Sequence, residues 1–498
     1  MEARRRIYTS VLVGMMLLML GCKSSQQEEK KYLPNWESLQ RHPVPDWFLD
    51  AKFGIYFHWG PYSVPAHRTE WYSHHMYTEG HPIRQYHEQT FGAVDEFGYK
   101  DFIPLFTAEH FDAEAWAELF RKSGAKFAGP VAEHADGFAM WDSKLTHWDA
   151  VEMGPKQDIV AAMEKAIRAE GMKFIVTYHR HWLYSWFPTW DLKTDASDEE
   201  YAGLYGPVVP QGTFVMANTP TNPLPDDDFN QEWLDRLDEL MEKYQPDMIW
   251  FDNKMDIIGE EYRQQFLANY YNSALKWGRE VVCTYKGEDM AVGSAVLDLE
   301  RSRMSEKKDF PWLTDDSIDW EAWSYISNPR YKSANRIVDF LVDVVSKNGA
   351  LLLNIPPTPD GRIPEAVQSR LLELGRWLEL NGEAIYGTRP WKVYGEGSQE
   401  ITEGHLTEHK NPPATANDIR FTTKDGNLYI TVLGWPGQQL KVSSLGKNAG
   451  LLDKEIESIK LLGSPAELSW KLTSEALEIN LPSEKQGDYA HSFKVNLK

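Results

Sequence analysis

Apolar positions recur in repeated helix-then-strand units between residues 46 and 381. In FDAEAWAELFRKSGAKFAGPVAEH, Asp112 can cap a helix with apolar residues every three or four positions, Gly124 can end it, and KFAGPVA is typical of a strand. The same order recurs in KQDIVAAMEKAIRAEGMKFIVTYH, NQEWLDRLDELMEKYQPDMIWFD, EEYRQQFLANYYNSALKWGREVVCTY and ANRIVDFLVDVVSKNGALLLNIP. Such repeats predict parallel strands joined by right-handed crossovers. Over about 340 residues, they favour an α/β fold built on a closed (β/α)8-like barrel.

The pattern changes after residue 391, where short segments alternate apolar and polar residues. NDIRFTTKDGNLYITVLGW, ALEINLP and SFKVNLK follow this period of two, and KDGN has the composition of a hairpin turn. They predict a C-terminal antiparallel β-sandwich over residues 392–498, after a catalytic domain over residues 44–391. The segment EGSQEITEGHLTEHKNPPATAND is predicted to be a polar loop that leads into the sandwich.

The N-terminus has the pattern of an export signal. Three arginines at residues 4–6 precede an apolar run over residues 11–20, which is shorter than the roughly 20 residues that span a bilayer. The following MLGC resembles a bacterial lipobox, in which Cys22 is lipidated after the signal is cleaved. We therefore expect a signal peptide over residues 1–22, a polar tether over residues 23–43, and a lipoprotein of a bacterial envelope (periplasm or outer membrane) whose only membrane contact is this anchor. The alternative is plain signal cleavage with an incidental cysteine.

Composition and charge narrow the class of function. The net charge of −22 argues against binding to nucleic acid, because an acidic surface repels phosphate. The chain has 20 Trp, 23 Tyr and 21 Phe, which either fill large cores or form flat platforms for sugar rings. Beyond Cys22, the only cysteine is Cys283, which we expect to be a buried strand residue. The sequence has no HExxH motif and no glycine-rich phosphate loop, so neither a metal nor a cofactor is expected. It also has no serine elbow, which argues against a serine hydrolase.

Polar and aromatic side chains follow several of the predicted strands. They are His58, Glu133, His134, Tyr178, His179 and Asp252, joined by Glu70 and Trp71 from a loop. The carboxyl ends of barrel strands face the active site, so these side chains are expected to gather there. Carboxylates with histidine and tryptophan suit glycoside hydrolysis, in which one carboxylate attacks the anomeric carbon and another protonates the leaving oxygen. Metal binding by the histidines of HH and HRH is the alternative.

An ordered set of motifs spans residues 44–391. These motifs are WFLDAKFGIYFHWGPYSVPA, EWY, WDSKLTHWD, GPKQDIV, IWFDN, LVDVVSKNGALLLNIPPTPDGRIPE and NGEAIYGTRPW. In content and order they resemble glycoside hydrolase family 29, the α-L-fucosidases. The resemblance implies a (β/α)8-like catalytic barrel with a C-terminal β-sandwich. It also implies exo-acting, retaining hydrolysis of terminal α-L-fucose from glycans by double displacement, without a metal.

The matching motifs transfer family roles to individual residues. The resemblance implies that Asp252 is the nucleophile and that Trp250 lines the sugar site. The implied substrate-binding residues are His58, Glu70, Trp71, His134 and, with a weaker match, Tyr178. Lys286 lies near the position of a sugar-binding arginine of the family.

The general acid/base of the family comes from the segment after the nucleophile strand, and its position varies. In this chain the segment contains Glu288, Glu300 and Glu306. We predict Glu300, because it follows the apolar run AVLDL and partial burial would raise its pKa.

One departure from the family affects sugar recognition. HADGF stands where the family commonly has HHDGF, so Ala135 replaces a histidine that contacts the sugar. The lost hydrogen bond either alters specificity or is replaced by His179 or His181 from YHRHW.

The function expected is thus an α-L-fucosidase acting on fucosylated glycans. An α-L-galactosidase or another related L-sugar glycosidase on the same fold is the first alternative, since L-galactose is L-fucose with an added 6-hydroxyl. A non-catalytic carbohydrate-binding protein is the alternative of another class. The fucosyl linkage and the oligomeric state stay open at this point.

Overall fold

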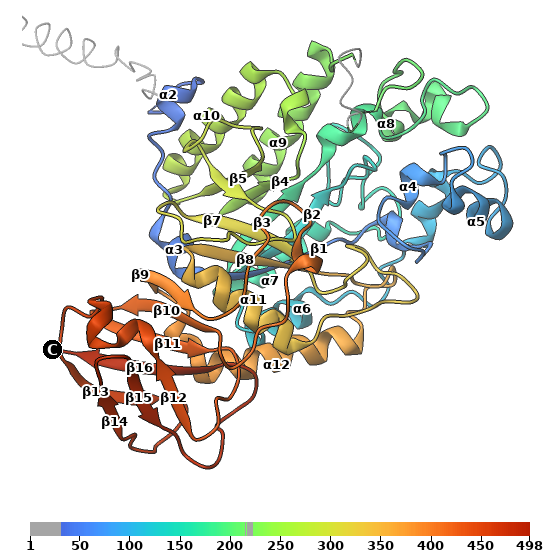
Figure 1. Cartoon of the computed structure of the whole chain (residues 1–498). Helices are drawn as coiled ribbons and strands as arrows, with labels where there is room; N and C mark the ends of the chain where they lie inside the picture. Colours follow the sequence, from blue (N-terminus) through green and yellow to red (C-terminus); the bar gives the residue numbers. More distant parts are fainter. Residues whose placement is uncertain (1–30, 215, 217–222) are drawn as a thin grey trace, which may run out of the picture.

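The structure, a computed structural model, describes residues 31–214, 216 and 223–498. The predicted signal peptide, Cys22 and the first part of the tether lie outside the described residues. Figure 1 shows a barrel with helices around it and a β-unit formed by the C-terminal part of the chain. Among the described residues, no helix has both the length and the apolar character needed to cross a membrane.

Eight parallel strands close into a barrel in chain order. They are β1 (Phe53–Phe57), β2 (Phe127–Glu133), β3 (Lys173–Tyr178), β4 (Met248–Phe251), β5 (Val282–Lys286), β6 (Val296–Asp298), β7 (Trp312–Ser317) and β8 (Gly349–Ile355). β1 pairs with both β2 and β8, which closes the ring. The predicted barrel is therefore confirmed.

Helices cover the outside of the barrel (Figure 1). The long ones are α6 (Ala113–Lys122), α7 (Ile159–Ala169), α9 (Asp227–Tyr244), α10 (Glu260–Trp277), α11 (Ala334–Ser346) and α12 (Glu365–Asn381). Shorter ones are α2 (Trp36–Leu39), α3 (Asp46–Ala51), α4 (Tyr72–His75), α5 (Pro82–Thr90) and α8 (Ala202–Tyr205). Asp112 caps α6 by accepting a hydrogen bond from the Ala115 amide, as its position predicts. The connections 287–295 and 299–311, both described in full, contain no helix.

Strand alternation divides the apolar side chains into two cores. The core inside the barrel contains Tyr56, Val131, Ile175, Trp250, Val282, Leu313 and Leu352. The residues between them, such as Val176 and Ile249, belong to the core between the barrel and its helices. Past the strand ends, the same alternation turns His58, His179 and Asp252 inward, where the histidine rings lie close together and His179 lies beside Trp250.

The C-terminal unit consists of two antiparallel sheets over one apolar core, which confirms the predicted β-sandwich. One sheet has the order β13-β16-β11-β10-β9 and the other has the order β12-β15-β14. The strands are β9 (Arg389–Glu396), β10 (Ile419–Lys424), β11 (Asn427–Val432), β12 (Gln439–Val442), β13 (Ile456–Leu461), β14 (Trp470–Leu472), β15 (Leu477–Asn480) and β16 (His491–Leu497).

Two details of this unit test the sequence prediction. The KDGN turn between β10 and β11 has positive φ at Asp425 (51°) and Gly426 (78°), as a two-residue hairpin of type I′ requires. The domain boundary predicted at residue 391 falls inside β9, so the prediction was wrong by a few residues and the sandwich begins at Arg389.

Polar contacts attach the sandwich to the barrel helices. Arg420 of β10 donates from Nε to Asp343 of α11 at 2.5 Å, and both side chains are buried. The Trp377 indole of α12 donates to the Ala490 carbonyl at 2.8 Å. Buried ion pairs of this kind hold one geometry, because breaking them leaves an unpaired charge.

Candidate active site

The structure gathers three histidines at the carboxyl end of the barrel. His58 follows β1, His134 follows β2 and His179 follows β3. Their ring centres lie 4.7 to 5.4 Å apart, and all three side chains are buried. The ring of Trp250 on β4 lies 5.2 Å from that of His179. Four consecutive strands thus contribute to one cluster of aromatic and imidazole rings.

Asn354 on β8 fixes the orientation of His58. Its Oδ1 accepts hydrogen bonds from the backbone N and from Nδ1 of His58, both at 2.9 Å. Its Nδ2 donates to the Trp323 carbonyl at 2.6 Å, and this hydrogen bond fixes the orientation of the Asn354 side-chain amide. Nδ1 of His58 therefore carries the proton, and Nε2 is the acceptor. Burial lowers the pKa of His58 to about 4, so the ring is neutral at neutral pH.

His134 and His179 carry unused hydrogen-bonding capacity. Nδ1 of each is buried and has no hydrogen-bond partner among the described residues. Burial, together with the neighbouring imidazoles, lowers the pKa of both rings well below the ordinary value. Because buried polar atoms are normally paired, these two nitrogens suit the hydroxyl groups of a bound ligand or water.

Asp252 and Glu300 meet at the buried ammonium group of Lys286. Lys286 Nζ lies 3.2 Å from Asp252 Oδ1 and 2.9 Å from Glu300 Oε2. Since both oxygens bond one nitrogen, they lie at most about 6 Å apart, close to the separation of about 5–5.5 Å found in retaining glycosidases. The structure therefore places Asp252 and Glu300, chosen from separate segments, in one site.

The two carboxyl groups differ in how their charge is stabilised. Burial opposes ionisation of Asp252, but the Lys286 ammonium and the Asn253 amide outweigh it and hold the pKa of Asp252 below its usual value. Burial raises the pKa of Glu300, and the opposing effect of Lys286 is smaller. The pKa values of Asp252 and Glu300 are thus shifted in opposite directions, as a nucleophile and a general acid need.

Two further carboxyl groups lie around Lys286. Asp315 Oδ1 is 3.3 Å from its ammonium, and Asp298 Oδ2 is 3.8 Å from it. Asp298 accepts from the Trp250 indole at 2.9 Å, and Asp315 accepts from the Tyr56 hydroxyl at 3.0 Å. Burial and the like charges nearby raise the pKa of Asp315 to about 6 and that of Asp298 well above its ordinary value. These residues hold Lys286 and Trp250 in place.

The sequence reasoning missed Asp298 and Asp315. A usable signal exists, because Asp298 stands two positions before Glu300 and Asp315 lies in TDDS at the end of another strand. Side chains two apart on a strand share a face, so an acid at 298 must point into the barrel if Glu300 does.

Glu70 and Trp71 border this site through Trp323. The Trp323 amide donates to Glu70 Oε2 at 3.1 Å, and the Trp323 ring lies 5.5 Å from that of His58. Trp71 packs against Trp186, with the ring centres 4.8 Å apart. The Trp186 ring in turn lies 6.1 Å from that of His134, so both residues lie near the histidine cluster. Their binding of the sugar stays a prediction.

The competing candidates for the acid/base lie elsewhere. Glu288 and Glu306 are exposed, whereas the Glu300 side chain is 14% exposed and bonded to Lys286. The geometry thus favours Glu300 among the three.

Tyr178 does not face the site, so its predicted contact with the sugar is corrected. Its ring packs on Phe251 at 6.2 Å between ring centres, in the core between barrel and helices. Strand alternation instead turns the next residue, His179, inward. His181 lies beside the site but bonds the Asn253 carbonyl at 2.8 Å, where it supports the backbone next to Asp252.

Glu133 also points away from the cluster. Its carboxylate pairs with Arg180 and, at 3.3 Å, with Arg236 of α9, and all three residues are buried. This is a structural ion-pair network, because both oxygens are already used.

The histidine cluster could also hold a metal ion, since one nitrogen from each of His58, His134 and His179 lies within 4.8 Å of the others. The Nδ1 of His58 is already bonded to Asn354. The sequence predicts neither a metal nor a cofactor, and this stays a prediction.

Comparison with known proteins gives a consistent picture. The family model described as Alpha-L-fucosidase matches residues 19–383, and the model described as Alpha-L-fucosidase C-terminal domain matches residues 412–497. Tissue alpha-L-fucosidase of Rattus norvegicus is 31% identical over 98% of this chain and 97% of its own length. Plasma alpha-L-fucosidase of Homo sapiens is 31% identical over 91% of this chain and 89% of its own.

Solved structures agree with these sequence relatives. The crystal structure of Thermotoga maritima alpha-fucosidase in complex with fucose superposes with a TM-score of 0.72 at 29% identity, covering 93% of this chain and 99% of that one. An alpha-L-fucosidase GH29 from Bacteroides thetaiotaomicron shares the fold, with a TM-score of 0.65 at 17% identity over 92% of this chain and 95% of that one. This chain therefore belongs to the α-L-fucosidase family, glycoside hydrolase family 29.

Proposed function

We propose that this protein hydrolyses terminal α-L-fucose from fucosylated glycans with retention of configuration. The observation that carries the proposal is the Asp252–Lys286–Glu300 arrangement, in which one buried ammonium holds two carboxyl groups of opposite protonation preference. We infer that the sugar is α-L-fucose because the chain belongs to the α-L-fucosidase family. The Thermotoga relative has been solved in complex with fucose.

The reaction follows from the positions of these groups. Asp252 attacks the anomeric carbon to form a fucosyl ester, while Glu300 gives its proton to the leaving oxygen. Glu300, now ionised, removes a proton from water, and the resulting hydroxide attacks the anomeric carbon and releases Asp252. Two displacements at one carbon restore its configuration. Lys286 keeps Asp252 ionised before the first step and offsets the charge that Glu300 gains.

The histidine cluster binds the sugar hydroxyls in this proposal. His58, His134 and His179 are neutral and can each donate or accept a hydrogen bond. His179 supplies, from the neighbouring strand, the imidazole that Ala135 lacks. This favours the alternative in which His179 replaces the hydrogen bond lost at Ala135 over the alternative in which the sugar specificity is altered.

His179→Ala is expected to lower kcat/KM for 4-nitrophenyl α-L-fucoside about 10-fold, mostly through KM, because one hydrogen bond of about 1–1.5 kcal/mol to the sugar is lost. Steady-state kinetics measures the effect, and the melting temperature checks the fold. His110→Ala is the matched control, since His110 lies outside the cluster and its side chain is 44% exposed. Unchanged KM in His179→Ala would remove this residue from the sugar site.

The deciding experiment follows the first-formed sugar by proton NMR. The chain is incubated with 4-nitrophenyl α-L-fucoside and, in parallel, with the α-L-galactoside. Early release of the α-anomer of fucose is the expected result, and the β-anomer would contradict retention. Cleavage of only the galactoside would favour the alternative substrate, whereas fucose binding without any turnover would favour the carbohydrate-binding alternative.

We also propose that the protein is exported and anchored by a lipid on Cys22. The support is the order of arginines at residues 4–6, the short apolar run and MLGC. Cys22→Ser is expected to move the protein from the membrane fraction to the soluble fraction of a bacterial host, with the wild type processed in parallel. An unchanged distribution between fractions would refute the anchor. One acyl chain binds a membrane only marginally, so complete retention requires more than one.

A further inference from the structure

The segment that joins the barrel to the sandwich returns to the barrel mouth. The two family models match residues 19–383 and 412–497, so residues 384–411 lie between them. After β9, the chain runs back to the barrel before β10 begins (Figure 1). There the Leu406 amide donates to the Glu300 carbonyl and the Glu408 amide donates to the Arg301 carbonyl, both at 2.9 Å. The joining segment thus covers the backbone that carries the proposed acid/base.

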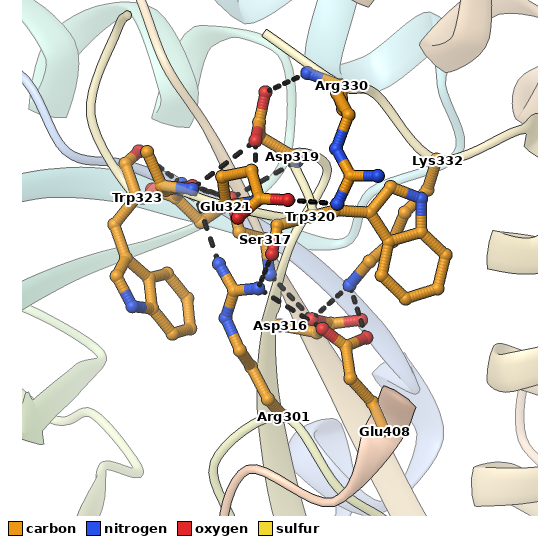
Figure 2. Close-up of polar contacts among 12 residues, drawn as sticks. Arg301, Asp316, Ser317, Asp319, Trp320, Glu321, Trp323, Arg330, Lys332 and Glu408 are labelled. Carbon is orange, nitrogen blue, oxygen red and sulfur yellow. Dashed lines mark hydrogen bonds and ion pairs between the residues drawn. The ribbon is translucent and has the colours of Figure 1, made fainter. Parts of the chain in front are cut away.

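Side-chain contacts fix the segment in this position. Thr407 and Ser302 share a hydrogen bond of 2.6 Å between their hydroxyl groups. Figure 2 shows the Glu408 carboxylate between Arg301 and Lys332, and it lies 3.1 Å from Arg301 Nη1. Lys332 also pairs with Asp316, and all of these groups are buried. A buried network with this many partners makes residues 406–408 part of the barrel mouth rather than a free loop.

A hollow of about 630 Å³ lies beside this segment. The barrel contributes Trp71, Trp320, Trp323 and Arg301 to its lining, and the joining segment contributes Leu406 and His409. Its volume falls in the range of about 300–1,000 Å³ that is usual for sites of small molecules. Leu406 is 52% exposed at its edge, so a large apolar side chain is available for contact.

The chemistry of the lining indicates a neutral, ring-shaped ligand. The tryptophans offer flat apolar faces, and both arginines of the lining are already paired with carboxylates. Glu321 pairs with Arg330, and Glu408 pairs with Arg301 (Figure 2). No unpaired arginine is therefore left in this lining for a sulfated or phosphorylated group.

We propose that residues 406–409 complete a subsite that binds the saccharide from which fucose is removed. The inference rests on the proposed function, in which Glu300 protonates the oxygen of that saccharide. The leaving group must then lie on the side of Glu300, and residues 406–408 are bonded to residues 300–302 there. Glu70 and Trp71 border both the histidine cluster and the hollow, so the two sites adjoin.

A different role for the segment would be to hold Glu300 in position and nothing more. That role affects every substrate whose leaving group needs a proton, whatever its shape. A leaving-group subsite instead affects substrates according to the size of the group that leaves. Fluoride is the smallest leaving group available, so a comparison with α-L-fucosyl fluoride separates the two roles.

The test uses the full chain and the variants Leu406→Ala and His409→Ala. Each is assayed with α-L-fucosyl fluoride and with 2′-fucosyllactose and 3-fucosyllactose. In each variant, kcat/KM for the fucosyllactose that the wild type cleaves faster is expected to fall about 10-fold more than kcat/KM for the fluoride. Leu275→Ala is the matched control, since Leu275 is 49% exposed on the last turn of α10. Its ratio of kcat/KM for the fucosyllactose to kcat/KM for the fluoride is expected to equal that of the wild type.

Equal falls on fluoride and oligosaccharide would overturn the subsite and leave the segment with the positioning role. Wild-type ratios in both variants would also overturn it. Hydrolysis of fluoride by the wild type without cleavage of either fucosyllactose would contradict a subsite for a neutral saccharide. Failure of the wild type on the fluoride itself would instead refute the proposed function, so the two failures are distinguishable.

Discussion

Asp252→Ala is expected to lower the turnover of 4-nitrophenyl α-L-fucoside by about 10⁴-fold or more while the protein stays folded. The substitution removes the carboxylate that forms the covalent ester in the proposed mechanism. Lys286 keeps Glu300 and Asp315 as partners within 3.3 Å, so the buried ammonium is not left unpaired and the fold should survive. Residual turnover and the melting temperature are the two measurements.

The space left by the Asp252 carboxylate in Asp252→Ala allows a second measurement. Azide can enter where the carboxylate stood and attack the anomeric carbon once, so Asp252→Ala is expected to form β-L-fucosyl azide from the activated α-fucoside. Asp256→Ala is the matched control, because Asp256 is an exposed carboxylate four residues further on, and it is expected to keep wild-type activity. Activity of Asp252→Ala within tenfold of wild type would refute Asp252 as the nucleophile.

Glu300→Ala is expected to lower kcat/KM for oligosaccharides by about 10²–10⁴-fold and to have a much smaller effect on α-L-fucosyl fluoride. A sugar alkoxide leaves slowly without a proton, whereas fluoride leaves without one. The ratio of the two substrates therefore reports the general acid. If Glu288→Ala or Glu306→Ala produces this pattern instead, the assignment of Glu300 is wrong.

The pH profile gives an independent test of the same residue. Glu300 acts as an acid only while it is protonated, and burial raises its pKa. The rate is therefore expected to fall as the pH rises through the pKa of Glu300. It should fall again at low pH, as Asp252 becomes protonated below its depressed pKa. With fucosyl fluoride, whose leaving group needs no proton, the fall at high pH should be absent, while the fall at low pH should remain.

The barrel and the sandwich could be predicted because each has its own hydrophobic period. Helix-then-strand units favour parallel strands, and alternation with a KDGN turn favours an antiparallel hairpin. Asp252 and Glu300 were predicted from a motif and from an apolar run, and the structure brings both to Lys286. That meeting could not be read from either segment, because it depends on β4, β5 and β6 being neighbours in the closed sheet.

The choice between Tyr178 and His179 shows where sequence reasoning fails. Strands of a parallel barrel are apolar on both faces, so FIVTY does not indicate which of its residues point inward. A prediction that is wrong by one position puts the neighbouring side chain in the site. Only the register of β3 between β2 and β4 decides that His179 faces the histidine cluster.

The sequence by itself determined the two domains, the family and the residue types of the site, since these follow from local periodicity and from motifs of contiguous residues. The tertiary structure alone decided that Asp298 and Asp315 surround Lys286, and that the polar segment after β9 returns to cover Glu300. A polar stretch such as EITEGHLTEHK has the composition of a solvated loop. Within it, Thr407 and Glu408 are buried. Glu408 pairs with Arg301 and Lys332, which are 107 and 76 residues away in the chain, and local sequence does not indicate such distant pairing.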